Sequence, residues 1–387
     1  MKIKFIFISI LLAINVQSQI KIQEHSIDDG IVHKKIINTI DTLSIDILKI
    51  DLSTNKYELR TVKANNLLNS KKTTSGMIKS LTDSGYKVIA AINGDFFESD
   101  GEIINNMISQ RKFVKGVRFT DSPFNPFVNT QFAVIDNGKL LMDQFVFNGQ
   151  LILPDGISEP ISRINSIADS NSISIYNSFQ GKFTPTKKEN WYISEIPLNI
   201  IRKYPDTLFC VSADSFTHSG NREIDSDFIL SANNKFAHYL EREIKPGDTL
   251  KIIFKFNPNY LNINSLIGGW PRLVEDGNNT MKINDSLEGD LPRFSKIKHP
   301  RTGIGFSKDS LTVFFITVDG RQESSSGMTL MEFAELMIDE GVYQGLNLDG
   351  GGSTTMVINN NVVNNPSDET GEREVGNCIV LIKKQKE

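Results

Sequence analysis

The stretch LNLDGGGSTTMVI, residues 346–358, joins two apolar runs through an aspartate and three consecutive glycines. Glycine weakens a strand, so three in a row need a reason. A turn needs one glycine, whereas three let the main chain lie flat against a neighbour, and bare N–H groups there can form an anion-binding concavity. We interpret this stretch as the binding surface for a negatively charged or sugar-bearing ligand. Its residues are Asp349, Gly350, Gly351, Gly352, Ser353 and Thr354.

A similar strand end occurs earlier in the chain. The segments DSGYKVIAAINGD (83–95) and DEGVYQGLNLDGG (339–351) each run from a helix end and a glycine, through a tyrosine and an apolar strand, to Asn-Gly or Asp-Gly. If the two units are alike, Asn93–Asp95 and Asp349 lie at the same edge of one sheet. Polar side chains at such edges can converge above a rigid scaffold.

Three further segments with glycine or proline carry an arginine: GGWPRLV (268–274), HPRTGIG (299–305) and VDGR (318–321). The guanidinium fork matches phosphate oxygens in a bidentate way. We therefore predict that three arginines bind an anion together with neighbouring polar groups. Asp95 and Asp319 are candidate partners of Asp349, although an Asp-Gly pair is most often only a turn. The remaining binding candidates are Arg272, Arg301, Arg321, Asn93 and Thr302.

Competing motifs do not fit. The GGGST run lacks the lysine of a P-loop, Thr355 stands where a nucleophile elbow needs glycine, and no Gly-x-Gly-x-x-Gly precedes an acidic residue. His299 is the one histidine near a candidate segment, so we interpret it as structural and expect neither a catalytic triad nor a histidine-rich zinc site. We expect no required cofactor, while the many aspartates would also suit calcium.

Composition narrows the class of protein. The 387 residues allow one large domain with an insertion, and the formal charge of −4 argues against nucleic acid as a partner. Two lysines and a short apolar run, followed by Val16-Gln17-Ser18, predict a signal peptide over residues 1–18 and a mature part from 19 to 387. We expect a secreted or periplasmic protein without a transmembrane anchor after processing. Cys210 and Cys378 fit buried free thiols, although a disulfide is allowed outside the cytosol.

Local patterns predict several elements. Residues 44–52 and 57–62 suggest a hairpin, 76–84 a helix, and 86–92 and 311–318 buried strands. Thr329 and Glu332 have the spacing of a capping box at the start of a helix that Gly341 ends. Short strand-like pieces between turns predict a β-rich insertion or subdomain over 115–265. We expect an α+β fold with a β-rich mixed sheet, a few packed helices and an active site at strand ends.

Taken as an ordered set, the segments INGDFF, GGWPRLV, HPRTGIG, VDGR, SGMTLMEFAELM, LDGGGSTTM and REVGNCIVL resemble the phosphodiester glycosidase family. The resemblance is dense from 266 to 382, includes 86–110, and is thin from 120 to 265. It implies hydrolysis of a sugar-1-phosphodiester, with a carbohydrate or phosphodiester-linked glycan as substrate. On that basis we expect Asp349 to act at the anomeric centre and the arginines to hold the phosphate.

Two other classes of function stay open at this level. The same glycine surface could bind an envelope glycan without cutting it. Alternatively, the protein could be a hydrolase that cleaves an ordinary glycoside or the phosphate ester itself. The products separate these alternatives, because a phosphodiester glycosidase releases free sugar and a phosphomonoester, whereas a phosphodiesterase releases sugar phosphate.

Overall fold

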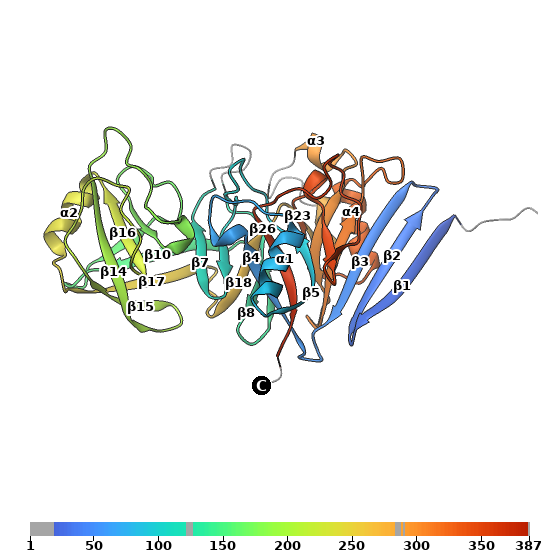
Figure 1. The fold of residues 1–387 in the computed structure, drawn as a ribbon, viewed down its shortest axis with the longest axis horizontal. Coiled ribbons are helices and arrows are strands. Elements are labelled where there is room, and N and C mark those ends of the chain that lie inside the picture. Colours follow the sequence, from blue (N-terminus) through green and yellow to red (C-terminus); the bar gives the residue numbers. More distant parts are fainter. Residues whose placement is uncertain (1–18, 121–126, 283–287, 289–290, 386–387) are drawn as a thin grey trace, which may run out of the picture.

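The structure is a computed structural model that describes residues 19–120, 127–282, 288 and 291–385. Within these ranges the chain forms three β-sheets and four α-helices (Figure 1). The pair β12–β13 is parallel, and the other strand pairs among the described residues are antiparallel. The expectation of a β-rich protein with mixed sheets and few helices is confirmed. The predicted signal peptide, residues 1–18, lies outside the described residues.

The eight-stranded sheet carries the N-terminal strands at one edge and the strands of the candidate site in its centre. Its order is β1-β2-β3-β22-β21-β23-β19-β20. The strands are β1 (Ile20–Asp28), β2 (Ile31–Asn38), β3 (Leu43–Asp51), β19 (Arg272–Glu275), β20 (Asn278–Asn279), β21 (Arg301–Phe306), β22 (Thr312–Val318) and β23 (Gln344–Leu348).

The five-stranded sheet combines chain segments from both ends of the sequence, in the order β25-β24-β5-β26-β4. The strands are β4 (Tyr57–Lys63), β5 (Lys87–Asn93), β24 (Met356–Ile358), β25 (Asn361–Val362) and β26 (Asn377–Lys383). β26 lies between β4 and β5 and is buried along almost its whole length.

The thirteen-stranded sheet has the order β11-β10-β17-β15-β14-β16-β13-β12-β7-β6-β18-β8-β9. All its strands lie between Met107 and Gly268, a range that includes the β-rich region predicted over 115–265. The strands are β6 (Met107–Ser109), β7 (Lys112–Val117), β8 (Gln131–Ile135), β9 (Leu140–Asp143), β10 (Val146–Ile152), β11 (Ser158–Ile161), β12 (Arg163–Ile164), β13 (Ile173–Tyr176), β14 (Ile193–Lys203), β15 (Thr207–Ser212), β16 (Phe228–Asn233), β17 (Thr249–Asn257) and β18 (Ile263–Gly268).

Helices cover the outer faces of these sheets. α1 (Thr74–Asp83) packs on the five-stranded sheet through Met77 and Ile78, and α4 (Leu330–Asp339) packs on the eight-stranded sheet through Phe333 and Met337. α2 (Lys235–Glu243) covers β14 and β16, and α3 (Pro292–Ser295) is a single turn. We call β10, β14–β17 and α2 the outer lobe, which extends to the left in Figure 1. Short 3-10 helices span Ala64–Asn66, Ser178–Gln180, Thr280–Lys282 and Gly351–Ser353.

A single buried cluster joins the three sheets. It takes Leu48 and Phe315 from the eight-stranded sheet, Ile92 and Ile379 from the five-stranded sheet, and Phe132 from the thirteen-stranded sheet. Burial of apolar side chains stabilises a fold by ~25 cal/mol per Å². The strand ends around the candidate site are therefore fixed by a core to which all three sheets contribute.

The predicted hairpin of residues 44–52 and 57–62 is wrong. β3 pairs with β2 and β22 in the eight-stranded sheet, whereas β4 pairs with β26 in the five-stranded sheet. The turn between them carries the chain from one sheet to the other. The expected common sheet for the two helix–strand units is also wrong, because β5 and β23 lie in different sheets, although their ends meet.

Other local predictions hold. The helix expected over 76–84 is α1, capped by the Thr73 side chain, and the capping box of Thr329 and Glu332 is confirmed. Cys210 and Cys378 are buried free thiols, and burial raises the pKa of Cys210 to about 12. None of the described helices has the length and apolar character that a membrane crossing requires.

Candidate active site

The candidate site lies where strands of two sheets end together. β5 ends at Asn93 and β23 ends at Leu348. The Asp349 N–H donates to the Gly94 carbonyl over 2.9 Å, and the Asn93 side-chain amide donates to the Asp349 carbonyl over 2.6 Å. The two strand ends are therefore joined directly by hydrogen bonds, which fixes the main chain of Asp349.

Asn93 is fully buried beneath this junction. Its Oδ1 accepts the Thr302 hydroxyl over 2.8 Å and the Thr355 N–H over 3.0 Å. Because its Nδ2 also donates to the Asp349 carbonyl, one side chain connects β5, β21 and the segment after β23. The structure therefore places Asn93 and Thr302 as internal supports of the site, with neither side chain exposed.

The three glycines after Asp349 are needed because neighbours approach each of them closely. A Cβ on Gly350 would lie 2.6 Å from the Pro300 carbonyl oxygen, too near for any side chain. Gly351 has φ +59°, and a Cβ there would lie 3.2 Å from the Arg321 guanidinium nitrogens. At Gly352 a Cβ would lie 2.2 Å from Arg373 Nη2. Two of the glycines thus admit arginine side chains beside Asp349.

The pKa of the Asp349 carboxyl lies close to neutral pH. Burial raises its pKa to about 6, and the Ser353 hydroxyl, the Arg373 charge, the Gly350 N–H and the Arg321 charge limit this rise. Each of the four partners favours the ionised form, so the carboxylate is the prevailing form at neutral pH. A carboxyl whose pKa is shifted by burial and by specific charged partners is a candidate functional group.

Arg373 is the functional candidate that sequence reasoning missed. Its Nε and Nη2 donate to the two carboxylate oxygens of Asp368 over 2.7 and 2.8 Å, a bidentate pair. This pair lies over Gly352. The sequence signal available was the segment REVGN, which contributed to the family resemblance without suggesting a role for its arginine.

Arg321 is exposed and has a left-handed backbone, with φ +60°. Its Nη2 donates to Nδ1 of His299 over 3.2 Å, and His299 Nε2 lies 3.1 Å from the Arg293 carbonyl. Nδ1 can accept only when it carries no proton, so this geometry requires the neutral imidazole protonated at Nε2. Burial and the nearby arginine charges lower the pKa of His299, which favours that neutral form. His299 therefore orients Arg321.

Arg301 is buried and faces inward. Its Nε donates to the Met328 carbonyl over 2.8 Å, and its Nη2 donates to the carbonyls of Phe294 and Ile297 over 2.7 and 3.1 Å. Burial, together with the Arg321 charge, lowers the pKa of Arg301 to about 9. The guanidinium also lies over the Phe294 ring, 5.1 Å from its centroid. Arg301 thus fixes the loop that precedes β21.

Arg272 does not join the other two predicted arginines. It lies in β19 opposite Leu346, but its guanidinium turns toward the start of β23, where it donates to Gln344 and pairs with Glu275 over 2.7 Å. The structure thus brings Arg321 and Arg373 to Asp349, with Arg301 behind them and Arg272 elsewhere.

Asp95 is buried one residue beyond Gly94. Its carboxylate accepts the Phe96 N–H over 2.9 Å, and the Asn105 N–H and side-chain amide over 3.0 and 2.9 Å. Burial raises its pKa to about 7, although these hydrogen bonds and the Lys115 charge lower it. Asp95 therefore holds together the loop after β5.

Asp319 directly follows the last residue of β22. Its carboxylate accepts the Ser44 hydroxyl over 2.7 Å and the Asn365 N–H over 2.9 Å. It also accepts the Asn364 amide over 3.2 Å, and that amide bonds the Thr354 carbonyl as well. Burial raises the pKa of Asp319. Asp319 is thus connected to the glycine segment through one side chain.

Two hydroxyls and three aromatic rings complete the surroundings. Thr354 and Thr355 are buried, and among the described residues their hydroxyls have no hydrogen-bond partner. The half-buried rings of Trp270 and Phe294 stack at 5.0 Å, and Phe96 meets both rings edge-on. Half-buried aromatic rings beside polar groups are common in ligand sites.

Comparison with known proteins identifies the relationship. Residues 199–382 match the phosphodiester glycosidase family. The expected resemblance is thereby confirmed. This range includes the candidate residues from Arg272 onward and Arg373, but it leaves out the segment with Asn93 and Asp95, which the structure places beside Asp349. It also extends further upstream than the dense resemblance found from residue 266.

Parts of the chain are also similar to individual proteins. The chain is 38% identical over 110 residues to human N-acetylglucosamine-1-phosphodiester alpha-N-acetylglucosaminidase, covering 27% of this chain. It is 32% identical over 176 residues to the prophage-derived protein YomE of Bacillus subtilis, covering 44% of this chain. In both cases the chain spans 21% of the length of the relative. A Synechocystis protein shares the fold with a TM-score of 0.71 and 16% identity, covering 94% of this chain and 64% of that one.

Metal binding stays a prediction. Among the residues that the structure describes, no three or more histidine, cysteine, aspartate or glutamate side chains cluster in a way that could hold a metal ion. The acidic residues at the candidate site are instead held by N–H groups, hydroxyls and arginines.

Proposed function

We propose that this protein is an exported hydrolase that cleaves a sugar-1-phosphodiester into free sugar and a phosphomonoester. The observation that carries the proposal is the Asp349 carboxyl at the end of β23, with the charges of Arg321 and Arg373 acting on it. The family match over residues 199–382 supports the class of reaction. In this proposal the reaction takes place at the strand ends that carry the candidate residues, as expected for a site on a rigid scaffold.

In the proposed reaction Asp349 acts at the anomeric carbon, either as the nucleophile or as the base that activates water. Its pKa of about 6 keeps it ionised at neutral pH. The bond between the anomeric carbon and the bridging oxygen breaks, the phosphomonoester leaves with the electron pair, and water supplies the hydroxyl of the free sugar. Such reactions pass through an oxocarbenium-like transition state, which a carboxylate stabilises.

The arginines suit the leaving group. A departing phosphomonoester gains negative charge, so stabilising that charge matters more than protonating the oxygen. Arg321 and Arg373 would bind the phosphate, while Asp95, Asp319, Asn93 and Arg301 would keep the surrounding loops in place. The stacked rings of Trp270 and Phe294 offer a surface for the sugar or for the group attached to the phosphate.

The test is turnover of a chromogenic sugar phosphodiester. Asp349→Asn should lower kcat by about 10²–10⁴-fold, because a carboxylate that reacts or moves a proton is removed. Asp83→Asn, at the exposed end of α1, serves as the matched control and should keep wild-type turnover. Unchanged turnover in a folded Asp349→Asn variant would rule out the assigned role.

The products decide between the remaining alternatives. Free sugar with a phosphomonoester supports a phosphodiester glycosidase, and sugar phosphate would identify a phosphodiesterase. Binding of the substrate without products would indicate a glycan-binding protein.

Export is proposed from the sequence of residues 1–18. The N-terminus of the secreted protein should then be Gln19, which N-terminal sequencing checks.

A further inference from the structure

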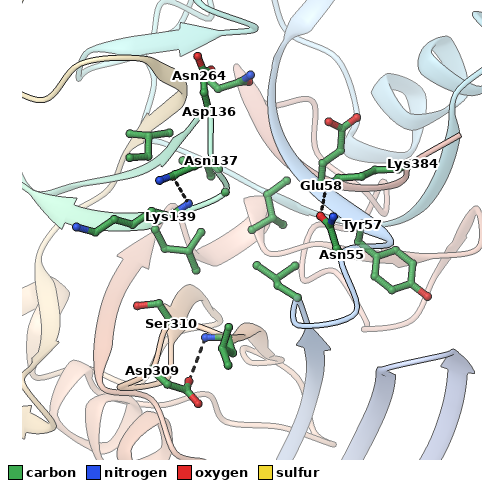
Figure 2. Close-up of a pocket in the computed structure, with 17 residues that line it drawn as sticks. Asn55, Tyr57, Glu58, Asp136, Asn137, Lys139, Asn264, Asp309, Ser310 and Lys384 are labelled. Carbon is green, nitrogen blue, oxygen red and sulfur yellow. Dashed lines mark hydrogen bonds between the residues drawn. The ribbon is translucent and has the colours of Figure 1, made fainter. Parts of the chain in front are cut away.

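Three neighbouring clefts lie at the strand ends opposite the candidate site. The first, of about 490 Å³, opens between the turns after β3, β8 and β21, and is lined by Asn55, Asn137 and Asp309 (Figure 2). β4 begins beside this cleft with Tyr57, and β22 begins directly after the lining residue Leu311 and ends at Val318, next to Asp319. The first cleft is therefore separated from Asp349 by the length of the strands.

The second and third clefts lie on either side of one hairpin tip. This tip, Lys203–Asp206, connects β14 with β15. The second cleft has a volume of about 280 Å³ and the third about 260 Å³, and both are lined by Arg111, Phe113, Phe254 and the tip. Each is close to the lower limit of ~300 Å³ for small-molecule sites.

Neighbouring clefts among these three share lining residues. Asp136 lines the first and the second, and Arg111 lines the second and the third. Between them, Arg111 Nε pairs with Asp136 Oδ1 over 2.7 Å. We call the whole the lower track. It crosses from the junction of the three sheets to the outer lobe, which suits an extended chain better than one small molecule.

Aromatic rings form much of the lower track beside the outer lobe. Phe113 stacks on Phe256 at 5.5 Å and lies 5.0 Å from Phe254. Tyr204 is 47% exposed on the hairpin tip. Sugar rings present apolar C–H faces, and flat aromatic rings with a polar rim are the surface on which such faces pack.

Polar groups along the same walls complement sugar hydroxyls and negative charge. The carboxylates of Asp206 and Asp227 and the amides of Asn177 and Asn262 line the second and third clefts. Five carboxylates line the three clefts, and three of them already pair with a cation: Glu58 with Arg60, Asp136 with Arg111 and Asp206 with Lys255. Positive charge comes from three exposed lysines that form no ion pair with any described residue. These are Lys112, Lys139 and Lys203.

From these observations we propose that the lower track is a second carbohydrate-binding site, which holds an extended glycan bearing phosphate or carboxylate groups. The choice of carbohydrate rests on the proposed function, whereas the preference for a charged chain rests on the lysines and the length of the track. In this arrangement the polymer is held at one end of the strands, and the candidate active site at the other end stays open to substrate.

The test compares binding of a phosphomannan with binding of neutral mannan, measured by calorimetry in an Asp349→Asn background so that no polymer is cut. The double variant Lys112→Glu, Lys203→Glu should weaken binding of the phosphomannan at least tenfold. Tyr204→Ala should weaken it severalfold, through lost ring stacking. The double variant Lys187→Glu, Lys188→Glu, on an exposed loop outside the three clefts, is the charge-matched control and should bind as tightly as the parent.

A small chromogenic phosphodiester separates this proposal from the proposed function. Its turnover should be the same in the wild type and in the Lys112→Glu, Lys203→Glu variant with Asp349 intact. The proposal is overturned if the phosphomannan does not bind, if it binds no better than neutral mannan, or if the Lys112→Glu, Lys203→Glu variant binds as tightly as the Lys187→Glu, Lys188→Glu variant. Absence of turnover in the wild type would instead refute the proposed function and leave the binding result to be judged alone.

Discussion

The surroundings of Asp349 depend on the glycines that follow it, because these glycines leave room for neighbouring side chains. Gly351 leaves room for Arg321, and Gly352 leaves room for the pair of Arg373 and Asp368. Any side chain at these two positions would push a guanidinium group away from the carboxylate. The glycines therefore act on the chemistry of Asp349 indirectly, through the positive charge that they let approach.

The first prediction at this scale concerns pH. If the ionised Asp349 is the reactive form, kcat/KM should rise with pH through about 6, the pKa of this group. The Arg373 charge lowers that pKa, so Arg373→Gln should move the rise to higher pH as well as lower the rate. A pH–rate profile measures both effects.

The control for this profile is Arg242→Gln, in α2 of the outer lobe. It should keep the wild-type profile. If Arg373→Gln lowers the rate without moving the profile, Arg373 does not act on the carboxylate that limits the reaction.

At single residues the sequence proposed Asp349, Arg321 and the glycines as one candidate site, because a strand end, a glycine run and an arginine in a turn are local signals. It missed Arg373, since an arginine between two glutamates in GEREVG reads as a solvated turn. It also grouped Arg272 with the site. Which way a strand side chain turns is set by neighbouring strands, and these cannot be read from spacing alone.

Among the elements, α4 carries the clearest sequence signal. The Thr329 hydroxyl accepts the Glu332 N–H, and the Glu332 carboxylate accepts the Thr329 N–H over 2.8 Å. Beneath the helix, Phe333 and Met337 share a buried cluster with Leu273 and Val274 of β19. Thr329 follows directly on Met328, whose carbonyl holds Arg301, so the start of this helix is connected to the candidate site.

The second prediction belongs to this helix. Thr329→Ala should cost about 1 kcal/mol of helix stability, because the first turn loses an acceptor for its N–H groups. Amide hydrogen exchange in residues 330–339 should be about fivefold faster, the factor that corresponds to 1 kcal/mol. Thr249→Ala, at an exposed strand position, should leave the exchange of these residues unchanged. Equal exchange in both variants would contradict the role of the cap.

Strands were easier to predict than their partners. The buried strands at 87–93 and 312–318 follow from short apolar runs that end in turn residues. The pairing of β3 and β4 was predicted from their closeness in sequence, and it failed because the chain changes sheets between them. β26 is buried at six of its seven positions, so it has no polar face to indicate which strands flank it.

In the molecule as a whole, the two features of interest lie at opposite ends of the strands. At one end lie Asp349 and the two arginines, and at the other lie the clefts of the lower track. Both depend on the cluster of apolar side chains shared by the three sheets. This two-ended arrangement could not be predicted from the sequence, because the clefts form between turns that are far apart along the chain.

The position of β26 has a practical consequence for expression work. Its two neighbours, β4 and β5, both precede residue 199, where the family match begins. A fragment that begins at residue 199 would lack both strands that pair with β26. It would also lack Asn93, whose side chain donates a hydrogen bond to the Asp349 carbonyl. Recombinant protein should therefore contain all residues from Gln19 onward, because residues 199–382 alone lack the strands that precede residue 199 and support them.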